Sequence, residues 1–261
     1  MALRTRNWLA LLMPLIFWSN SGSADTCVDC HQERDPKIVA QWRNSSHTEA
    51  GCVGCHGSSH KSAAARKPEA CVGCHAGSSE HSYRTSKHAV LVRLDGKNLD
   101  WSRPLVRGNY RAPSCAYCHL YEGQHDTTKS AQTSSRPDRN MQVWICSGCH
   151  SPRYAAEQLA AGDRLLEIGQ LKMQEARAVR QRAKAEGFEL DGFDQILEKM
   201  DQRIMSNLRL GSGHQSPDYQ WWHGQPALDG MLLRIKGLYS KLSRQRLLDS
   251  ATVNLKNGSK N

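Results

Sequence analysis

Five copies of the pentapeptide C-x-x-C-H contain all ten cysteines of this 261-residue chain. Each copy places two thiols two residues apart and an imidazole directly after the second thiol. Such a set can form a disulfide, bind zinc or attach a haem covalently. The copies are CVDCH at 27–31, CVGCH at 52–56, CVGCH at 71–75, CAYCH at 115–119 and CSGCH at 146–150.

Disulfides and zinc explain the pattern less well than haem does. A disulfide between cysteines two residues apart closes a small loop, joins nothing distant and gives no reason for the histidine. Zinc sites would use the pairs two at a time and would leave one pair over. C-x-x-C-H is the signature of c-type haem attachment, in which the cysteines bind the porphyrin and the histidine reaches the iron. We therefore predict five covalently attached haems c.

The motifs define the first set of candidate site residues. Their cysteines are the predicted thioether positions, and their histidines are the predicted proximal ligands of the haem irons. The thioether residues are Cys27, Cys30, Cys52, Cys55, Cys71, Cys74, Cys115, Cys118, Cys146 and Cys149. The proximal ligands are His31, His56, His75, His119 and His150.

Seven histidines lie outside the motifs, which is enough to give every iron a second imidazole. Six of them are the predicted distal ligands, and His223 is left over. Methionine is another known axial ligand, but most methionines after the leader fall on apolar helix faces and are predicted to pack in a core. The distal candidates are His47, His60, His81, His88, His125 and His214.

The first half of the chain is poor in large apolar residues, and the whole chain has only three phenylalanines. Side chains alone would hardly offset the entropy of ordering such a segment. Five porphyrins would supply the missing apolar mass. The formal charge of +10 is spread without a dense Lys/Arg run or a nucleic-acid motif, so a nucleic-acid partner is not expected.

Sequence composition divides the chain into four parts. Residues 1–24 combine Arg4 and Arg6 with a short apolar run and small residues, which is typical of a secretory signal peptide. Residues 25–153 form the predicted pentahaem region, which is rich in loops. Residues 154–249 carry apolar residues at helical spacing and are predicted to form a helical bundle. Residues 250–261 are predicted to be a disordered tail. The fold class is therefore mainly α, and the mature protein is expected to be soluble and periplasmic.

Several segments resemble the hydroxylamine oxidoreductase family of octahaem cytochromes c. The stretch CVDCHQERDPKIVAQWRNSSHTEA is similar to the first haem segment of that family. Residues 52–89, with RKPEAC and SKH, are similar to its fifth and sixth segments, and APSCAYCHLYEGQHD is similar to the seventh. WICSGCHSPRYA and the helices that follow resemble the eighth segment and the C-terminal bundle.

The resemblance also implies what this chain lacks. The family places its second, third and fourth haems in the interval that here holds only residues 48–51, and its fourth haem binds substrate. Tyr219 is the nearest counterpart of the tyrosine that crosslinks to that haem in a neighbouring subunit, and we expect it to be a packing residue. Pentahaem nitrite reductase is also similar in its last haems, but its catalytic motif ends in lysine, whereas all five motifs here end in histidine.

The distal ligand pattern shared by these families implies pairings between histidines. It assigns His47 to the haem of Cys71 and Cys74, and His88 to that of Cys146 and Cys149. It assigns His125 to the haem of Cys52 and Cys55, and His214 to that of Cys115 and Cys118. The haem of Cys27 and Cys30 would take His60 or His81.

An iron with two imidazole ligands has no open position, so the histidine supply favours electron transfer over catalysis. We predict an exported pentahaem cytochrome whose partners are other cytochromes or a membrane quinol-linked redox protein; self-association into a homo-oligomer is also considered. No catalytic residue is assigned. The alternative is an oxidoreductase that acts on hydroxylamine, nitrite or a similar small nitrogen or sulfur compound at one open haem. The first haem is the best candidate for this, with Tyr219 and His223 as proton donors.

Overall fold

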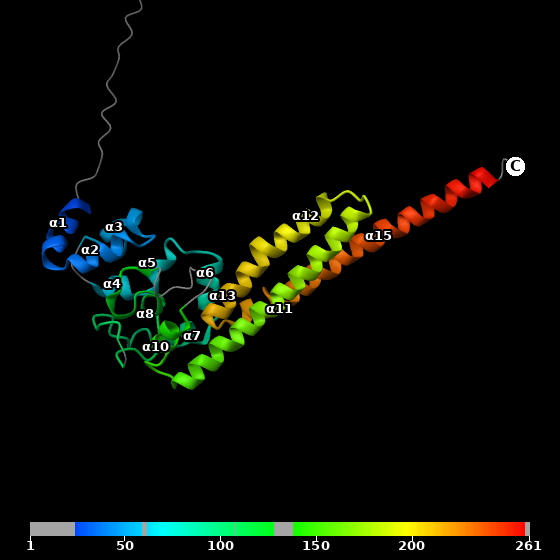
Figure 1. Cartoon of the computed structure of the whole chain (residues 1–261). Helices are drawn as coiled ribbons and strands as arrows, with labels where there is room; N and C mark the ends of the chain where they lie inside the picture. The colour runs from blue at the N-terminus through cyan, green and yellow to red at the C-terminus, as the bar shows by residue number, and fades with distance from the viewer. Residues whose placement is uncertain (1–23, 59–61, 107, 128–137, 259–261) are drawn as a thin grey trace, which may run out of the picture.

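Short helices joined by turns make up the first half of the structure (Figure 1). The computed structural model describes residues 24–58, 62–106, 108–127 and 138–258, and no strand occurs among them. The mainly α prediction is confirmed. The short helices are α1 (Ala24–Arg34), α2 (Pro36–Arg43), α3 (Gly51–His56), α4 (Ser62–Arg66), α5 (Pro68–Val72), α6 (Ser78–Arg84), α7 (Lys87–Asp95), α8 (Cys115–His119) and α10 (Arg139–Cys146).

Local sequence signals explain where several of these helices begin. Asp35, Ser86 and Asp138 each precede a helix and accept hydrogen bonds from backbone N–H groups of its first turn. Such caps satisfy donors that have no partner within the helix. All five motifs lie within or at the end of a short helix, which places the motif histidine at or just beyond the last turn.

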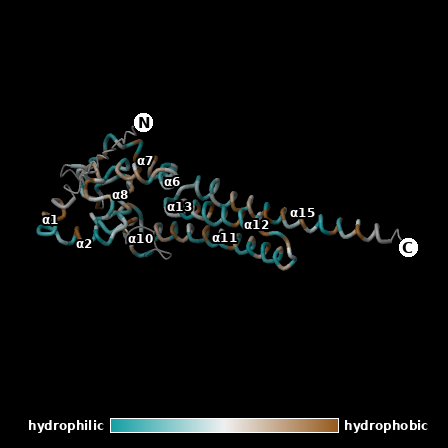
Figure 2. The backbone as a smooth tube through the Cα atoms, turned by 90° about the horizontal axis from the view of Figure 1, so that it is seen from above, coloured by the Kyte–Doolittle hydropathy of each residue, from teal (hydrophilic) through white to brown (hydrophobic). Residues whose placement is uncertain are grey.

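Long helices form the second half and extend away from the short ones (Figures 1 and 2). Ser151 caps α11 (Pro152–Ala185), and Pro152 occupies its first position, where a missing N–H costs nothing. The chain then forms α12 (Asp191–Glu198), a π-helical segment (Lys199–Met205) and α13 (Ser206–His214). The short α14 (Pro217–Gln220) and the long α15 (Gln225–Gly258) complete this part.

Small residues recur every seventh position on the buried face of α11. A seven-residue period keeps one stripe of a helix facing its neighbours, and small side chains allow the helices to approach closely. At Gly169 an added Cβ would lie 2.8 Å from Leu208 Cδ2 and 2.9 Å from Met205 Sδ, so the neighbouring helix fills that space. The stripe consists of Ala155, Gly162, Gly169, Ala176 and Ala183.

A continuous apolar core lies between α11, the α12–α13 segment and α15. Phe193, Met200 and Leu208 are fully buried in it, as is Leu228 of α15. These residues belong to the helical stripes that the sequence predicts, and Met200 packs in the core as expected. No described helix is both long enough and apolar enough to cross a membrane.

The last helix differs from the sequence prediction at its end. Residues 250–258 continue α15, where a disordered tail was expected. Leu247, Leu248 and Val253 are exposed there, because this end projects beyond the helices that α15 packs against (Figure 2). A helix can continue without a packing partner where the sequence permits it, which is the case here. The predicted signal peptide lies almost wholly outside the described residues.

The short helices pack against the long ones at two main places. Helix α13 packs against α6, and α10 packs against α11, where the Arg139 guanidinium forms an ion pair with Asp163. Helix α1 lies at the opposite end of the short-helix region from α6 in both views (Figures 1 and 2). The first motif is therefore far from the junction with the long helices.

Candidate functional site

The first three motifs lie next to one another in chain order. Burial raises the pKa of the Cys52 thiol, and the nearby Cys27 of the preceding motif raises it further. Burial also raises the pKa of Cys55, with the next largest contribution from Cys71. The second motif is therefore close enough to the first and to the third for their thiols to shift the pKa values of its own cysteines.

The same order continues through the last motifs. The side chains of Cys71 and Cys115 lie next to each other, so that Cys115 raises the pKa of Cys71 whereas Cys71 lowers that of Cys115. Burial, then Cys146 and Cys149, raises the pKa of Cys118 to about 12. Each motif thus has its sequence neighbour beside it in space, and the five form a continuous series.

Four histidines from outside the motifs face four motif histidines. These are the partners that the family resemblance assigns. The two histidines of each pair come from different segments of the chain. The pairs, with the distances between ring centroids, are His47 and His75 (5.7 Å), His56 and His125 (6.1 Å), His88 and His150 (6.2 Å), and His119 and His214 (6.5 Å).

Local contacts hold His47 and His125 in place. The His47 backbone N–H donates to Ser45 Oγ (3.0 Å), which fixes the turn after α2. The His125 backbone N–H donates to Gln41 Oε1 (3.0 Å), so α2 also positions this residue. His125 Nδ1 is 2.8 Å from the Gly123 carbonyl, which can only accept a hydrogen bond. The proton must therefore reside on Nδ1, and Nε2 keeps its lone pair for a metal.

His88 and His214 are placed by helix ends. Ser86 Oγ accepts from the Ala89 N–H (3.2 Å) and fixes the first turn of α7, which carries His88. His214 is the last residue of α13, and its Nδ1 is 3.0 Å from Oγ of the fully buried Ser82. His214 is thus a contribution of the long-helix region to a site that otherwise belongs to the short-helix region.

Four of the paired histidines are kept in the form that binds metals by a lowered pKa. Burial lowers the pKa of His56, His88 and His119, and a nearby histidine lowers each further. Burial, followed by the charge of His119, lowers the pKa of His214 to about 4. These imidazoles are therefore neutral near pH 7, and a neutral ring nitrogen can donate its lone pair to iron.

Comparison with known proteins places the chain in a family. A family model described as "Seven times multi-haem cytochrome CxxCH" matches residues 24–192. The chain belongs to the multihaem cytochrome c family. This cytochrome carries five such motifs, whereas the family description names seven.

A curated relative and two solved structures agree with the predicted resemblance. The relative is a probable nitrite reductase–hydroxylamine oxidoreductase fusion protein of Kuenenia stuttgartiensis, 24% identical over 196 residues. The match covers 52% of this cytochrome but only 23% of that protein. A chain of a reducing HAO-like protein complex of the same organism matches with a TM-score of 0.59 and 17% identity, covering 88% of this chain and 87% of that one. A hypothetical multihaem protein matches with a TM-score of 0.59 and 16% identity, covering 76% and 59% of the two chains. The resemblance to hydroxylamine oxidoreductase-like cytochromes is confirmed.

The paired residues fit covalently bound haem. Two metal–nitrogen bonds of about 2 Å each place opposing ring nitrogens about 4 Å apart and the ring centroids roughly 6 Å apart. All four centroid separations are close to this, and the Nε2 atoms of His47 and His75 are 3.4 Å apart. In the same region the indole N–H of Trp42 is buried and has no hydrogen-bond partner among the described residues, so a donor is left for a bound group.

The distal ligand of the first motif is the one that the structure does not place. His60 lies outside the described residues. His81 belongs to α6, at the far end of the region from α1, so the structure does not bring it to the first motif (Figures 1 and 2). The physical reason is the packing of α6 on α13, which draws His81 toward Asp218 and His223. Tyr219 and His223 lie there too, away from the first motif, and Tyr219 is buried as a packing residue.

Sequence reasoning missed the residues that orient the histidines. Gln41 and Ser82 are polar residues on short helices, and nothing in their spacing marks them as partners of His125 and His214. Asp218 was also missed. It lies in the first turn of α14, where acidic residues are common, so its position did not mark it as a partner of histidines. Only the fold brings these residues to the histidines that they contact.

Proposed function

We propose that this cytochrome transfers electrons through five covalently bound haems c. The observation that carries the proposal is the pairing of four motif histidines with four others. Each pair would hold a haem iron on both faces and leave no position for a substrate. Haem supplies one-electron redox chemistry, and its potential depends on axial ligands, hydrogen bonding and burial.

The residues of the chain have three tasks in this proposal. The ten motif cysteines anchor the haems by thioether bonds, and the five motif histidines are the proximal ligands. His47, His88, His125 and His214 are the distal ligands. The Gly123 carbonyl and Ser82 Oγ contact Nδ1 of His125 and His214 and fix the orientation of these rings, which also tunes their basicity. Gln41 holds the His125 backbone in place. The division into a haem region (25–153) and a helical region (154–249) belongs to the same proposal.

The ordered series of motifs supports a relay over isolated centres. Thiols of successive motifs affect one another, from Cys27 through to Cys149, so neighbouring haems would be close. A partner at either end could then exchange electrons with the whole set.

We propose an exported, periplasmic protein whose partners are other cytochromes or a quinol-linked membrane protein. A structural neighbour belongs to a reducing HAO-like protein complex, which supports assembly with a second protein.

A second function is favoured by the first motif alone. Because His81 lies elsewhere, His60 is the remaining candidate for the iron held by His31. If His60 does not bind that iron, the first haem has an open face and could act on hydroxylamine, nitrite or a related small compound. Proton donors for such a reaction would have to come from residues other than Tyr219 and His223.

Two measurements on the purified haem protein test the proposal. Mass spectrometry is expected to give the mass of the polypeptide plus five haems. A mass that corresponds to fewer attached haems contradicts the haem count. Carbon monoxide added to the reduced protein is expected to leave the Soret band unchanged. A carbon monoxide complex, together with turnover of hydroxylamine or nitrite, would establish the second function instead.

A further inference from the structure

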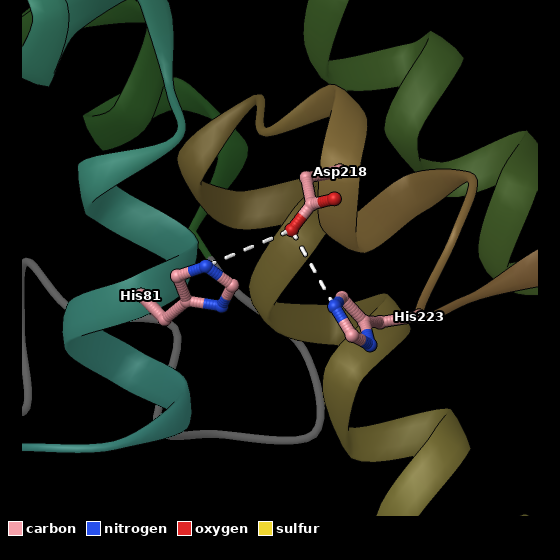
Figure 3. A group of neighbouring side chains, drawn as sticks. All are labelled: His81, Asp218 and His223. Carbon is pink, nitrogen blue, oxygen red and sulfur yellow. Dashed lines mark ion pairs between the residues drawn. The ribbon is translucent and has the colours of Figure 1, made fainter.

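We propose that His81, Asp218 and His223 form a binding site for one divalent transition-metal ion, separate from the haem sites. The three side chains come from α6, α14 and the turn before α15, and they converge on one point (Figure 3). One ligand atom of each lies within 4.8 Å of those of the other two. The proposal does not depend on the electron-transfer function.

The distances suit a shared ion better than direct hydrogen bonds. Asp218 Oδ2 is 4.0 Å from His81 Nε2 and 3.5 Å from His223 Nε2, and both exceed the usual length of about 2.7–3.2 Å. Metal–ligand bonds of about 2.1 Å in a tetrahedral site place the donor atoms roughly 3.4 Å apart. Small side-chain movements would therefore complete the site.

The fold fixes the two halves of the site against each other. Thr85 Oγ1 donates to the His81 carbonyl (2.9 Å) and is 2.8 Å from Ser216 Oγ, which ties α6 to the start of α14. At Gly211 an added Cβ would be 2.6 Å from the Tyr219 carbonyl carbon, so only glycine lets α13 approach this turn so closely. The turn that carries Asp218 is thus held in position by both neighbours.

A buried aromatic ring further orients the two imidazoles. The ring centroid of Tyr219 is 5.4 Å from that of His81 and 5.0 Å from that of His223. Tyr219 is buried, whereas the side chains of His81 and His223 are partly exposed. The imidazoles therefore rest on a fixed surface and still present their outer edges to ions in solution.

The donor set indicates the kind of ion. Two imidazoles and one carboxylate suit zinc, nickel or copper(II), whereas calcium and magnesium prefer oxygen ligands alone. Three protein ligands leave a coordination position for water or for a group from a partner. The exposed Trp221 and Trp222 adjoin the site in sequence, so a partner that bound them would come close to that position.

Isothermal titration calorimetry of the haem-loaded protein, made without a polyhistidine tag, tests the site with ZnCl2 as the probe. The expected stoichiometry is one Zn²⁺ per chain. His223→Ala and Asp218→Asn are expected to weaken binding by roughly tenfold or more, because each removes one ligand. Asp201→Asn is the matched control, since Asp201 is an exposed carboxylate that pairs only loosely with Arg177 (3.9 Å). It is expected to bind zinc like the wild type.

The haem spectrum and far-UV circular dichroism of each variant check that only the zinc site has changed. Equal zinc affinity in all four proteins would overturn the proposal, because binding would then occur elsewhere. Absence of any titratable binding in the wild type would also overturn it and would leave Asp218 as the partner of two imidazoles in an ordinary ion-pair cluster. Zinc-dependent loss of haem absorbance would likewise contradict a site separate from the haems.

Discussion

The haem-binding region and the long-helix region are stabilised in different ways. The long helices share a core of fully buried Phe, Met, Leu and Ile side chains. The region of the motifs has a smaller apolar cluster, half of which is tyrosine, formed by Leu105, Tyr110, Ala116, Tyr117, Tyr121 and Ile145. Its helices are short, and isolated helices of that length are marginal in water.

The difference indicates where the stabilising apolar surface comes from. The long helices bury their own side chains in a shared core, so we expect them to fold without haem. The short helices carry the cysteines and histidines that bind porphyrin, so their folding should be coupled to haem attachment, as in other domains built around metal ligands.

Withholding haem is expected to have the largest effect. When the chain is produced without the haem-attachment machinery, residues 24–150 should be unfolded, whereas α11–α15 should keep their helices. Limited proteolysis followed by mass spectrometry should yield a resistant fragment that begins near Pro152. Protection of the motif region, or complete digestion of both regions, would contradict the division.

Removing a core side chain should destabilise only the long helices. Leu228 is fully buried, and Leu228→Ala is expected to cost about 2–5 kcal/mol of folding free energy. The matched control is Leu171→Ala on the 62% exposed Leu171, expected to change stability by less than about 0.5 kcal/mol. Thermal unfolding followed at 222 nm and at the Soret band should show the loss in the helical signal first. Identical shifts in both signals would mean that the regions unfold as one.

Removing the one distal ligand supplied by the long helices should alter one haem. His214→Ala leaves the iron of His119 with an open face, so one haem of the set should become high-spin and bind carbon monoxide. His223→Ala, a substitution nine residues further on, should leave the haem spectrum unchanged. An unaltered spectrum in His214→Ala would show that the iron of His119 takes another ligand.

An exposed ion pair between long helices should have the smallest effect. Arg180 donates to both carboxylate oxygens of Asp194 (2.5 and 2.9 Å), which holds the pKa of Asp194 below its ordinary value. A lowered folded-state pKa adds stability above the unfolded pKa, and this is lost as the pH falls through the folded value. Asp194→Asn should lower the urea midpoint slightly at pH 7, with the difference fading below about pH 4. A difference that persists at pH 2 would assign it to packing.

The sequence predicts the parts of this protein that depend on local pattern. The C-x-x-C-H motifs and the buried stripes of the long helices follow from spacing, whereas α11 begins two residues before the predicted start at residue 154, because Ser151 caps it and Pro152 fits its first position. The four histidine pairs were reached only through the family resemblance, because no local signal joins His214 to His119. His81 was misplaced because its neighbours, Asp218 and His223, are brought to it by packing of helices more than a hundred residues apart.

Low-temperature electron paramagnetic resonance of the fully oxidised protein tests the central claim most directly, because it separates irons with two imidazole ligands from irons with an open face. The four histidine pairs predict low-spin signals from at least four haems, and the proposed relay predicts five with no high-spin iron. A high-spin signal equal to one haem would assign an open face to the first motif. High-spin signals from two or more haems would contradict the pairings themselves.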